Sequence, residues 1–422
     1  MKNRAAALCL LAAGMAIPLI AQEGPVPTGI PHLDHVFVIL MENHAYKQVI
    51  GNPNMPFTNK YAASVNMATN YYAVGHPSLT NYLEIVGGSN FGVRDDNAPD
   101  WHNSACSPNI VASTVSLEST STAICPISGT GTDGATPVID YTNEVSGPPG
   151  AIDIDGVHGY AANPNTVAET IADELVHAGK SWKSYQESLP STGADSVNTA
   201  DGFFSNLTDI PTALPGTGLT NSSLVALYAV KHNPFAYFQN VQEGANPDLS
   251  LQQVAGFEGK GGLFADLASA RVPSLSFIAP NQCNDQHGRG NAGAICEYDP
   301  NDNGTLTGLN PGLMYQGDVT LQTLVTAIHK SEAWQRGKNA IVIVWDENDY
   351  SVSPTTNQVL LTVDTNYGRK GVQSNKYYTH FSLLRSLEAG FRLPCLNHAC
   401  DASTAVISDL FASGDRDQDN NE

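Results

Sequence analysis

The sequence carries little charge for its length, and most of that charge is negative. Only 14% of the 422 residues are charged, and 20 Lys and Arg stand against 41 Asp and Glu, for a formal net charge of −21. Nucleic acids and anionic lipids are held by basic surfaces, so we expect no nucleic-acid partner and no lipid surface bound by charge alone. A hydrophobic content of 41% excludes disorder as the main state.

Long apolar runs are missing beyond the N-terminus. Lys2 and Arg4 precede an apolar run at 5–21, which is typical of a signal peptide (1–21) cleaved near Ala21. A membrane anchor is the alternative, but the run is short for a bilayer and polar, Pro-rich sequence follows it. No later segment offers about 18 consecutive apolar residues. We therefore expect no stable membrane insertion and a periplasmic or secreted location; the oligomeric state stays open.

Cys-x-x-Cys pairs, a common sign of zinc sites, are also absent. Six cysteines remain once the leader removes Cys9, and an even number suits an oxidising compartment. The missing Cys-x-x-Cys pairs and the export signal favour disulfides over zinc binding. Six cysteines allow fifteen connectivities, and three local loops are favoured among them because short loops close at the lowest entropic cost. The expected pairs are Cys106 with Cys125, Cys283 with Cys296, and Cys395 with Cys400.

Three apolar segments predict buried parallel strands, and a polar cluster follows each. They are 35–41 before Glu42, Asn43 and His44; 275–279 before 280–287; and 340–345 before Asp346, Glu347, Asn348 and Asp349. Amphipathic patterns between them predict helices that begin near Asn163 and after Asp318. The fold class is therefore α/β, with a mostly parallel central sheet flanked by helices. Ligands of such sheets bind beyond the carboxyl ends of the strands.

We expect a single domain at 22–413. Residues 104–149 form a loop-rich excursion, rich in Thr, Ser, Gly and Pro, and 414–422 are a polar tail. The polar clusters come from both ends of the chain, which favours one compact unit over two independent ones.

Four carboxylates follow the predicted strands. They are Glu42, Asp285, Asp346 and Glu347. If they converge, repulsion and desolvation would each be costly, and a bound divalent cation would remove that cost. Asn43 adds an oxygen ligand, with the imidazoles of His287 and His380 nearby. Such ligands leave calcium, magnesium, manganese and zinc open.

The sequence of residues 75–88 predicts a helix with the hydroxyl of Ser78 at its N-terminus. Pro77 and Ser78 suit its first residues, and an anion is favoured at a helix N-terminus. A serine becomes an effective nucleophile when a base or metal lowers the pKa of its hydroxyl. Metal, hydroxyl and anion site together predict phosphoryl or sulfuryl transfer. The alternative is that Ser78 serves only as a helix N-cap.

Four motifs occur in chain order and carry a resemblance. They are Met41-Glu42-Asn43-His44, the helix start at 76–83, the segment 280–287, and Val344-Trp345-Asp346-Glu347. Together they resemble the bacterial phosphoesterase family, which contains acid phosphatases and phospholipases C within the alkaline-phosphatase-like superfold. Residues 182–188 and 231–235 are similar to its acid-phosphatase branch. The resemblance covers about residues 34–395.

The resemblance implies roles for these residues. It makes Glu42, Asn43 and Asp346 metal ligands and Ser78 the hydroxyl that becomes phosphorylated. Ser78, Asn81 and Gly88 keep the spacing of the nucleophile helix in nucleotide pyrophosphatases, which implies that Asn81 contacts phosphoryl oxygens. The resemblance also implies that His287 and His380 stabilise the leaving group or complete the metal shell. Asp285 and Glu347 would complete or orient the metal ligands, and His76 would lie beside the phosphate. The Glu-Asn pair implies one metal ion rather than two.

Some of these residues also have structural interpretations. His380 can equally be a structural histidine. Lys183 and Lys231 are interpreted as solvated surface charges, although a dianionic phosphate needs countercharge and Lys183 is kept as a candidate substrate contact.

We therefore expect an exported, metal-dependent, acid-phosphatase-like phosphomonoesterase that hydrolyses small phosphate esters through a phosphoserine. A phosphodiesterase or phospholipase C using the same site is the alternative, although the segment 348–351 differs from that of phospholipases C. A sulfatase is disfavoured because no Cys-x-Pro-x-Arg motif stands at the helix start. A non-catalytic, exported metal-binding protein is the remaining possibility.

Overall fold

The structure is a computed structural model. It describes residues 24–93, 95–101, 125–129, 139–140, 151–152, 166–199, 227–269, 271–288, 311–348 and 357–412. The predicted signal peptide, most of the loop-rich excursion and the polar tail lie outside these residues, so the predicted domain boundaries stay predictions.

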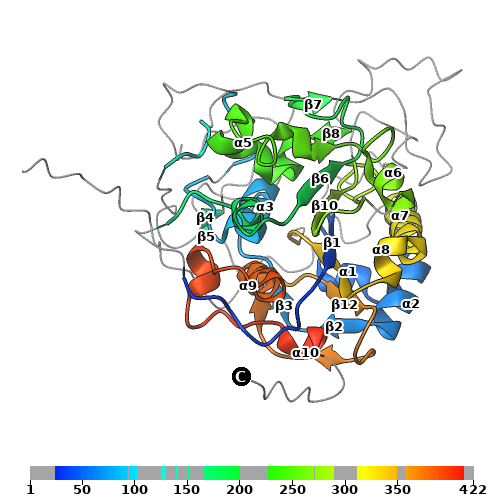
Figure 1. The fold of residues 1–422 in the computed structure, drawn as a ribbon. Helices are drawn as coiled ribbons and strands as arrows, with labels where there is room; N and C mark the ends of the chain where they lie inside the picture. The colour runs from blue at the N-terminus through cyan, green and yellow to red at the C-terminus, as the bar shows by residue number, and fades with distance from the viewer. Residues whose placement is uncertain are drawn as a thin grey trace, which may run out of the picture.

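An eight-stranded sheet forms the centre of the fold (Figure 1). Its strands are, in spatial order, β13 (Gln373–Ser374), β2 (Asn66–Ala68), β12 (Leu361–Thr365), β11 (Asn339–Trp345), β1 (His35–Met41), β10 (Leu275–Ala279), β6 (Trp182–Gln186) and β9 (Val254–Ala255). The run from β11 to β9 is parallel, and β12 is antiparallel to both of its neighbours. This confirms the predicted α/β class and all three predicted strands.

Strand order determines where the polar clusters meet. The three predicted strands are direct neighbours in the order β11, β1, β10, and they pair in parallel. Every β11 residue is buried, as is every β1 residue after His35, because helices cover both faces of the sheet. The residues that follow these strands therefore emerge side by side at one edge.

Helices pack in two groups with the sheet between them (Figure 1). One group is α3 (Ser78–Gly87), α4 (Ile171–His177) and α9 (His380–Phe391); the other is α2 (Pro56–Ser64), α6 (Leu263–Ala268), α7 (Pro311–Lys330) and α8 (Glu332–Gln335). The short helices α1 (Tyr46–Val49), α5 (Gln239–Glu243) and α10 (Ser408–Phe411) lie outside these groups. Two-stranded pairs complete the described strands: β3 (Tyr71–Tyr72) with β14 (Tyr378–Thr379), β4 (Ile139–Asp140) with β5 (Ala151–Ile152), and β7 (Asn198–Thr199) with β8 (Tyr228–Ala229).

Two helices begin at other residues than predicted. Helix α4 begins at Ile171, not near Asn163, because Thr170 and Asp173 form a capping box there. Val167 is held outside the helix by hydrogen bonds of its backbone to Asn397. Helix α7 begins at Pro311, and Asp318 inside it caps the first turn of α2 instead.

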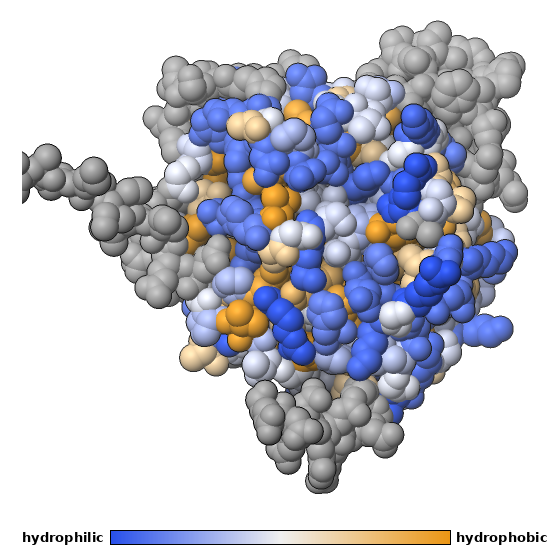
Figure 2. All heavy atoms as spheres, viewed as in Figure 1, coloured by the Kyte–Doolittle hydropathy of each residue, from blue (hydrophilic) through white to orange (hydrophobic). Residues whose placement is uncertain are grey.

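One predicted disulfide lies wholly within the described residues and is confirmed: Cys395 is bonded to Cys400. Cys125 and Cys283 are also disulfide-bonded, and their predicted partners, Cys106 and Cys296, lie outside the described residues. No helix in the described part of the chain is long and apolar enough to cross a membrane. The face in Figure 2 is mostly hydrophilic, with small separate hydrophobic patches.

Candidate active site

The carboxylates that follow the three parallel strands meet at one edge of the sheet. The backbone N–H of Glu42 donates to the carbonyl of Asp285 at 2.9 Å, and that of Asp346 donates to the carbonyl of Met41 at 2.9 Å. The side chains of Glu42, Asp285, Asp346 and Glu347 are all at least 99% buried. The predicted convergence is therefore present, and it comes from strand order.

Helix α3 brings the hydroxyl of Ser78 to these carboxylates. Ser78 is its first residue and is fully buried. The hydroxyl lies 3.0 Å from Glu42 Oε2 and 3.2 Å from Glu347 Oε1. Pro77 occupies the N-cap position, so the alternative that Ser78 is only an N-cap is wrong. The hydroxyl instead has two carboxylate oxygens within reach of its proton.

The far end of α3 fixes this placement. The helix ends at Gly88, whose φ of 70° is left-handed. A Cβ at this position would approach the carbonyl oxygen of Leu396 to 2.6 Å. Glycine is required there on both counts, because other residues rarely adopt that conformation and would collide.

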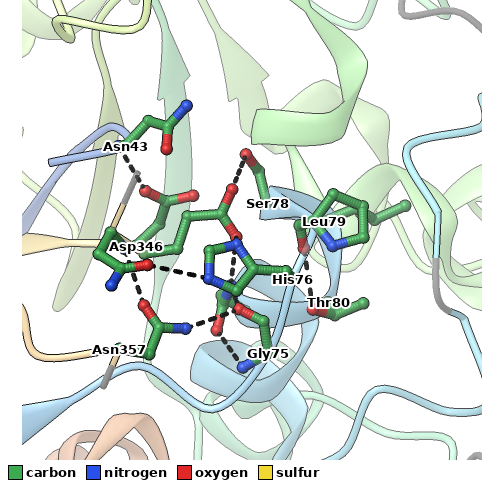
Figure 3. Close-up of polar contacts among 12 residues, drawn as sticks. Asn43, Gly75, His76, Ser78, Leu79, Thr80, Asp346 and Asn357 are labelled. Carbon is green, nitrogen blue, oxygen red and sulfur yellow. Dashed lines mark hydrogen bonds and ion pairs between the residues drawn. The ribbon is translucent and has the colours of Figure 1, made fainter. Parts of the chain in front are cut away.

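Glu347 connects the start of α3 to the end of β11. Its Oε2 lies 2.8 Å from His76 Nδ1 and accepts a hydrogen bond from Asn81 Nδ2 at 3.0 Å. The Asn81 amide also accepts from the backbone of Val74 and Gly75. These contacts hold the carboxylate toward Ser78 (Figure 3). Asn81 was predicted to contact phosphoryl oxygens; its side chain forms hydrogen bonds with Glu347 and with the backbone that precedes the helix.

Asn43 stands between the two strand ends. Its backbone has a left-handed φ of 55°, a conformation that asparagine tolerates better than most residues. Its N–H donates to Asp346 Oδ1 at 3.0 Å (Figure 3). The other oxygen, Asp346 Oδ2, is buried and has no hydrogen-bond partner among the described residues.

A histidine without a predicted role joins the carboxylates on the other side of Glu42. His232, in the 3₁₀ helix η1 (Val230–His232), lies with Nε2 3.0 Å from Glu42 Oε1 and Nδ1 3.3 Å from Asp285 Oδ2. One ligand atom from each of these three residues lies within 4.8 Å of the others. This buried Glu/His/Asp group could hold a metal ion.

Burial makes the ionised carboxylates unfavourable without a cation. The pKa of Glu42 is raised well above its ordinary value by burial and then by Asp346. Burial and Glu42 raise the pKa of Asp285, and burial and Glu347 raise that of Asp346. A divalent ion would favour the charged forms of all three. The oxygen-rich donor set and the unpartnered Asp346 Oδ2 fit such an ion.

The predicted histidines lie in different parts of the site. His287 is half-buried, with Nε2 3.2 Å from Lys231 Nζ. His380 is fully buried at the start of α9, where Nε2 donates to the Asp346 carbonyl at 2.6 Å and Nδ1 accepts from Tyr71. Burial lowers the pKa of His380 to about 4, so it is neutral. Its contacts support the end of β11 and do not include Ser78.

The structure reverses the expected positions of the two lysines: Lys231 lies beside Ser78, and Lys183 does not. Lys183 on β6 is ion-paired with Asp266 of α6 and donates to the Gly261 carbonyl at 3.0 Å, which leaves it outside the group around Ser78. Lys231 was interpreted as solvated, and that is wrong: it is 2% exposed and its Nζ lies 3.4 Å from Ser78 Oγ. The order of residues along the chain did not show that η1 lies against α3.

Tyr82, one turn after Ser78, is a further residue that the sequence did not single out. Its hydroxyl donates to Glu42 Oε1, and its ring stacks on His232 with centroids 5.2 Å apart. Burial and Glu42 raise the pKa of Tyr82, so the phenol stays protonated and keeps donating. Tyr82 thus orients the two residues at the centre of the candidate metal group.

We expect Tyr82→Phe to lower both stability and turnover. The lost hydrogen bond should reduce the free energy of unfolding by about 1–2 kcal/mol. Activity should fall by about 10-fold because Glu42 loses its orienting donor. Thermal melts and steady-state kinetics measure the two effects. Tyr61→Phe is a matched control, since Tyr61 donates to the buried Asp364 away from Ser78; it should lose stability alone. Equal activity of both variants would contradict the role of Tyr82.

Comparison with known proteins gives distant similarities over most of the chain. A phosphatidylinositol-3-phosphatase of Mycobacterium tuberculosis is 22% identical over 394 residues, which are 93% of this chain and 87% of that protein. An acid phosphatase of Aspergillus fumigatus is 24% identical over 88% of this chain but 58% of its own length, so the chain spans about three fifths of that relative. A solved structure of an alkaline phosphatase superfamily protein from Vibrio parahaemolyticus covers 90% of this chain and 72% of its own, at 10% identity and a TM-score of 0.44.

The sequence pattern of the Phosphoesterase family matches residues 52–296, which are more than half of the chain. This match and the phosphatase relatives confirm the prediction of a hydrolase that acts on phosphoric ester bonds. The chain belongs to the Phosphoesterase family.

Proposed function

We propose that this protein is an exported, metal-dependent phosphomonoesterase, similar to acid phosphatases, that works through a phosphoserine at Ser78. The contact of the Ser78 hydroxyl with Glu42 and Glu347 carries the proposal, since it joins a nucleophile to proton acceptors in a buried site. The names of the relatives support a phosphatase. The leader-like N-terminus and the Cys395–Cys400 disulfide support export.

The residues available for one divalent ion surround the nucleophile. They are Glu42, Asn43, Asp346, Glu347 and Asp285, with His232 as an addition from the structure. When bound, the ion supplies countercharge for the phosphoryl group and lowers the pKa of the hydroxyl. The raised pKa values of the buried carboxylates support this requirement.

The remaining chemistry is assigned to the chain itself. Ser78 loses its proton to the oxygen of Glu42 or Glu347 that it contacts, and Oγ attacks phosphorus in line with the ester oxygen. The bond from phosphorus to the ester oxygen breaks, and the alcohol leaves with a proton from a nearby acid. His287, predicted to stabilise the leaving group, is half-buried beside the site with its Nε2 facing Lys231 Nζ, so we assign it the role of orienting that ammonium rather than of giving the proton. Water then hydrolyses the phosphoserine and releases phosphate.

Substrate preference tests the proposal. We expect the purified protein to hydrolyse p-nitrophenyl phosphate with a kcat/KM about 100-fold above that for bis-p-nitrophenyl phosphate, because a monoester has no second ester arm to place in a buried site. Release of p-nitrophenol measures both reactions. A preference for the diester would favour the phosphodiesterase alternative. Tight metal binding without hydrolysis of either ester at any pH would favour the non-catalytic alternative.

A further inference from the structure

The ammonium group of Lys231 is built into the site next to the nucleophile. Lys231 is 98% buried, and its Nζ lies 3.4 Å from Ser78 Oγ, 3.1 Å from Asp96 Oδ2 and 3.2 Å from His287 Nε2. Among the described residues it is the one Lys or Arg side chain that contacts Ser78. Burying a lysine is expensive, so its position calls for an explanation beyond packing.

Asp96 and His287 are among the residues that hold this ammonium in a defined direction. Asp96 supplies the opposite charge through Oδ2, while its Oδ1 accepts the backbone N–H of Leu79 in the first turn of α3. The Nδ1 of His287 faces the carbonyl of Gly288 at 3.0 Å, and a carbonyl only accepts. His287 therefore donates from Nδ1, which leaves Nε2 to accept from Lys231. Asp96 thus links the lysine to the same helix turn that carries Ser78.

We propose that Lys231 binds the transferring phosphoryl group and determines the preference for monoester dianions over diesters. This rests on the proposed role of Ser78: a phosphorus atom bonded to Oγ would carry its non-bridging oxygens within reach of Nζ. A monoester dianion has one more negative charge than a diester, and a buried ammonium interacts strongly with that charge. Lys231 is then a catalytic residue whose partners are the nucleophile and the substrate.

A purely structural role of the Lys231–Asp96 ion pair predicts a different effect of removing the lysine. If Lys231 served only to neutralise Asp96, its removal would lower stability and would reduce activity on all substrates by the same factor. The ratio of kcat/KM between monoester and diester separates these interpretations, because packing damage does not depend on substrate charge.

The test compares wild type, Lys231→Met and the double variant Lys231→Met/Asp96→Asn, which removes both charges of the ion pair. Lys370→Met is the matched control, since Lys370 pairs with the buried Asp364 away from Ser78. For both Lys231 variants we expect kcat/KM for p-nitrophenyl phosphate to fall by about 100-fold and that for bis-p-nitrophenyl phosphate by about 10-fold or less. The monoester preference should therefore fall by about 10-fold in these variants and stay unchanged in Lys370→Met.

An unchanged monoester preference in folded Lys231 variants would overturn the proposal. If these variants fail to fold, inhibition of the wild type decides: inorganic phosphate should inhibit about 10-fold more tightly than the monoanion dimethyl phosphate, and equal inhibition would overturn the proposal. Ser78→Ala separates this from the proposed function. If Ser78→Ala is inactive while the preference is unaffected by Lys231, only the role of Lys231 fails; if Ser78→Ala is as active as wild type, the proposed function itself fails.

Discussion

Replacing Ser78 with alanine should reduce kcat for p-nitrophenyl phosphate by about 10⁴-fold or more while the protein stays folded. The variant removes the only atom that we assign to bond with phosphorus. It also removes a hydrogen-bond donor from Glu42 and Glu347, which should cost about 1–3 kcal/mol of stability. Steady-state kinetics and thermal melts monitored by circular dichroism separate the two effects.

Ser331 offers a matched control for this substitution. It is a buried serine at the start of α8, and its hydroxyl caps the helix by accepting the N–H of Trp334. Ser331→Ala should lose about 1 kcal/mol of stability and keep its activity. A Ser78→Ala enzyme that retains near wild-type turnover with its metal bound would disprove the assignment of the nucleophile.

Removing the metal should have the second large effect. Dialysis against a chelator should reduce activity by about 10³-fold or more, and adding back one divalent ion should restore it. The melting temperature should fall as well, because buried carboxylates lose their countercharge. A chelator saturated with calcium, magnesium, manganese and zinc is the control for non-specific effects. Full activity and an unchanged melting temperature after chelation would exclude a required metal.

The metal-free protein should also show a particular dependence of stability on pH. The folded state raises the pKa of Glu42, Asp285 and Asp346 above the ordinary values near 4. Their stabilising protonated forms are fully present below about pH 4 and are lost as the pH rises through the raised pKa values. Each group therefore lowers the free energy of unfolding by up to about 1.4 kcal/mol per pH unit in that window.

Melting temperatures of the chelated protein between about pH 4 and pH 7 measure this effect. They should decline relative to those of the metal-loaded protein, in which the cation favours the ionised carboxylates at neutral pH. Parallel curves for the two forms would show that the carboxylates do not hold the metal.

Local sequence was enough to predict the strands and the residues that follow them. Short apolar runs bounded by polar clusters and alternating with helix patterns indicate buried strands, and parallel strands end at a common edge. The meeting of Glu42 and Asp346 follows from that rule. Ser78 was predictable for a similar reason, because Pro77 and the apolar spacing after it mark a helix start.

Residues delivered by irregular segments could not be predicted in this way. Asp96 lies in a loop after α3, and Lys231 and His232 lie in a single 3₁₀ turn, so no periodicity indicates what they contact. Lys183 is the opposite case: the sequence kept it as a candidate substrate contact, but its position on β6 directs it toward Asp266. The start of α4 was also missed. Pro164 indicates an earlier helix start, but the capping box of Thr170 and Asp173 begins the helix at Ile171, and a long-range hydrogen bond from the Val167 backbone to Asn397 keeps Val167 out of it.

The sequence by itself therefore determined the α/β class, the acidic edge of the sheet and the serine at a helix start, because each depends on short-range patterns of polarity and turn chemistry. Only the tertiary structure decided that Lys231 contacts Ser78, that His232 contacts Glu42, and that His380 supports a backbone carbonyl. Those contacts join residues 34 to 190 positions apart, and their geometry depends on how η1 and α9 pack against α3 and the sheet, which no local pattern encodes.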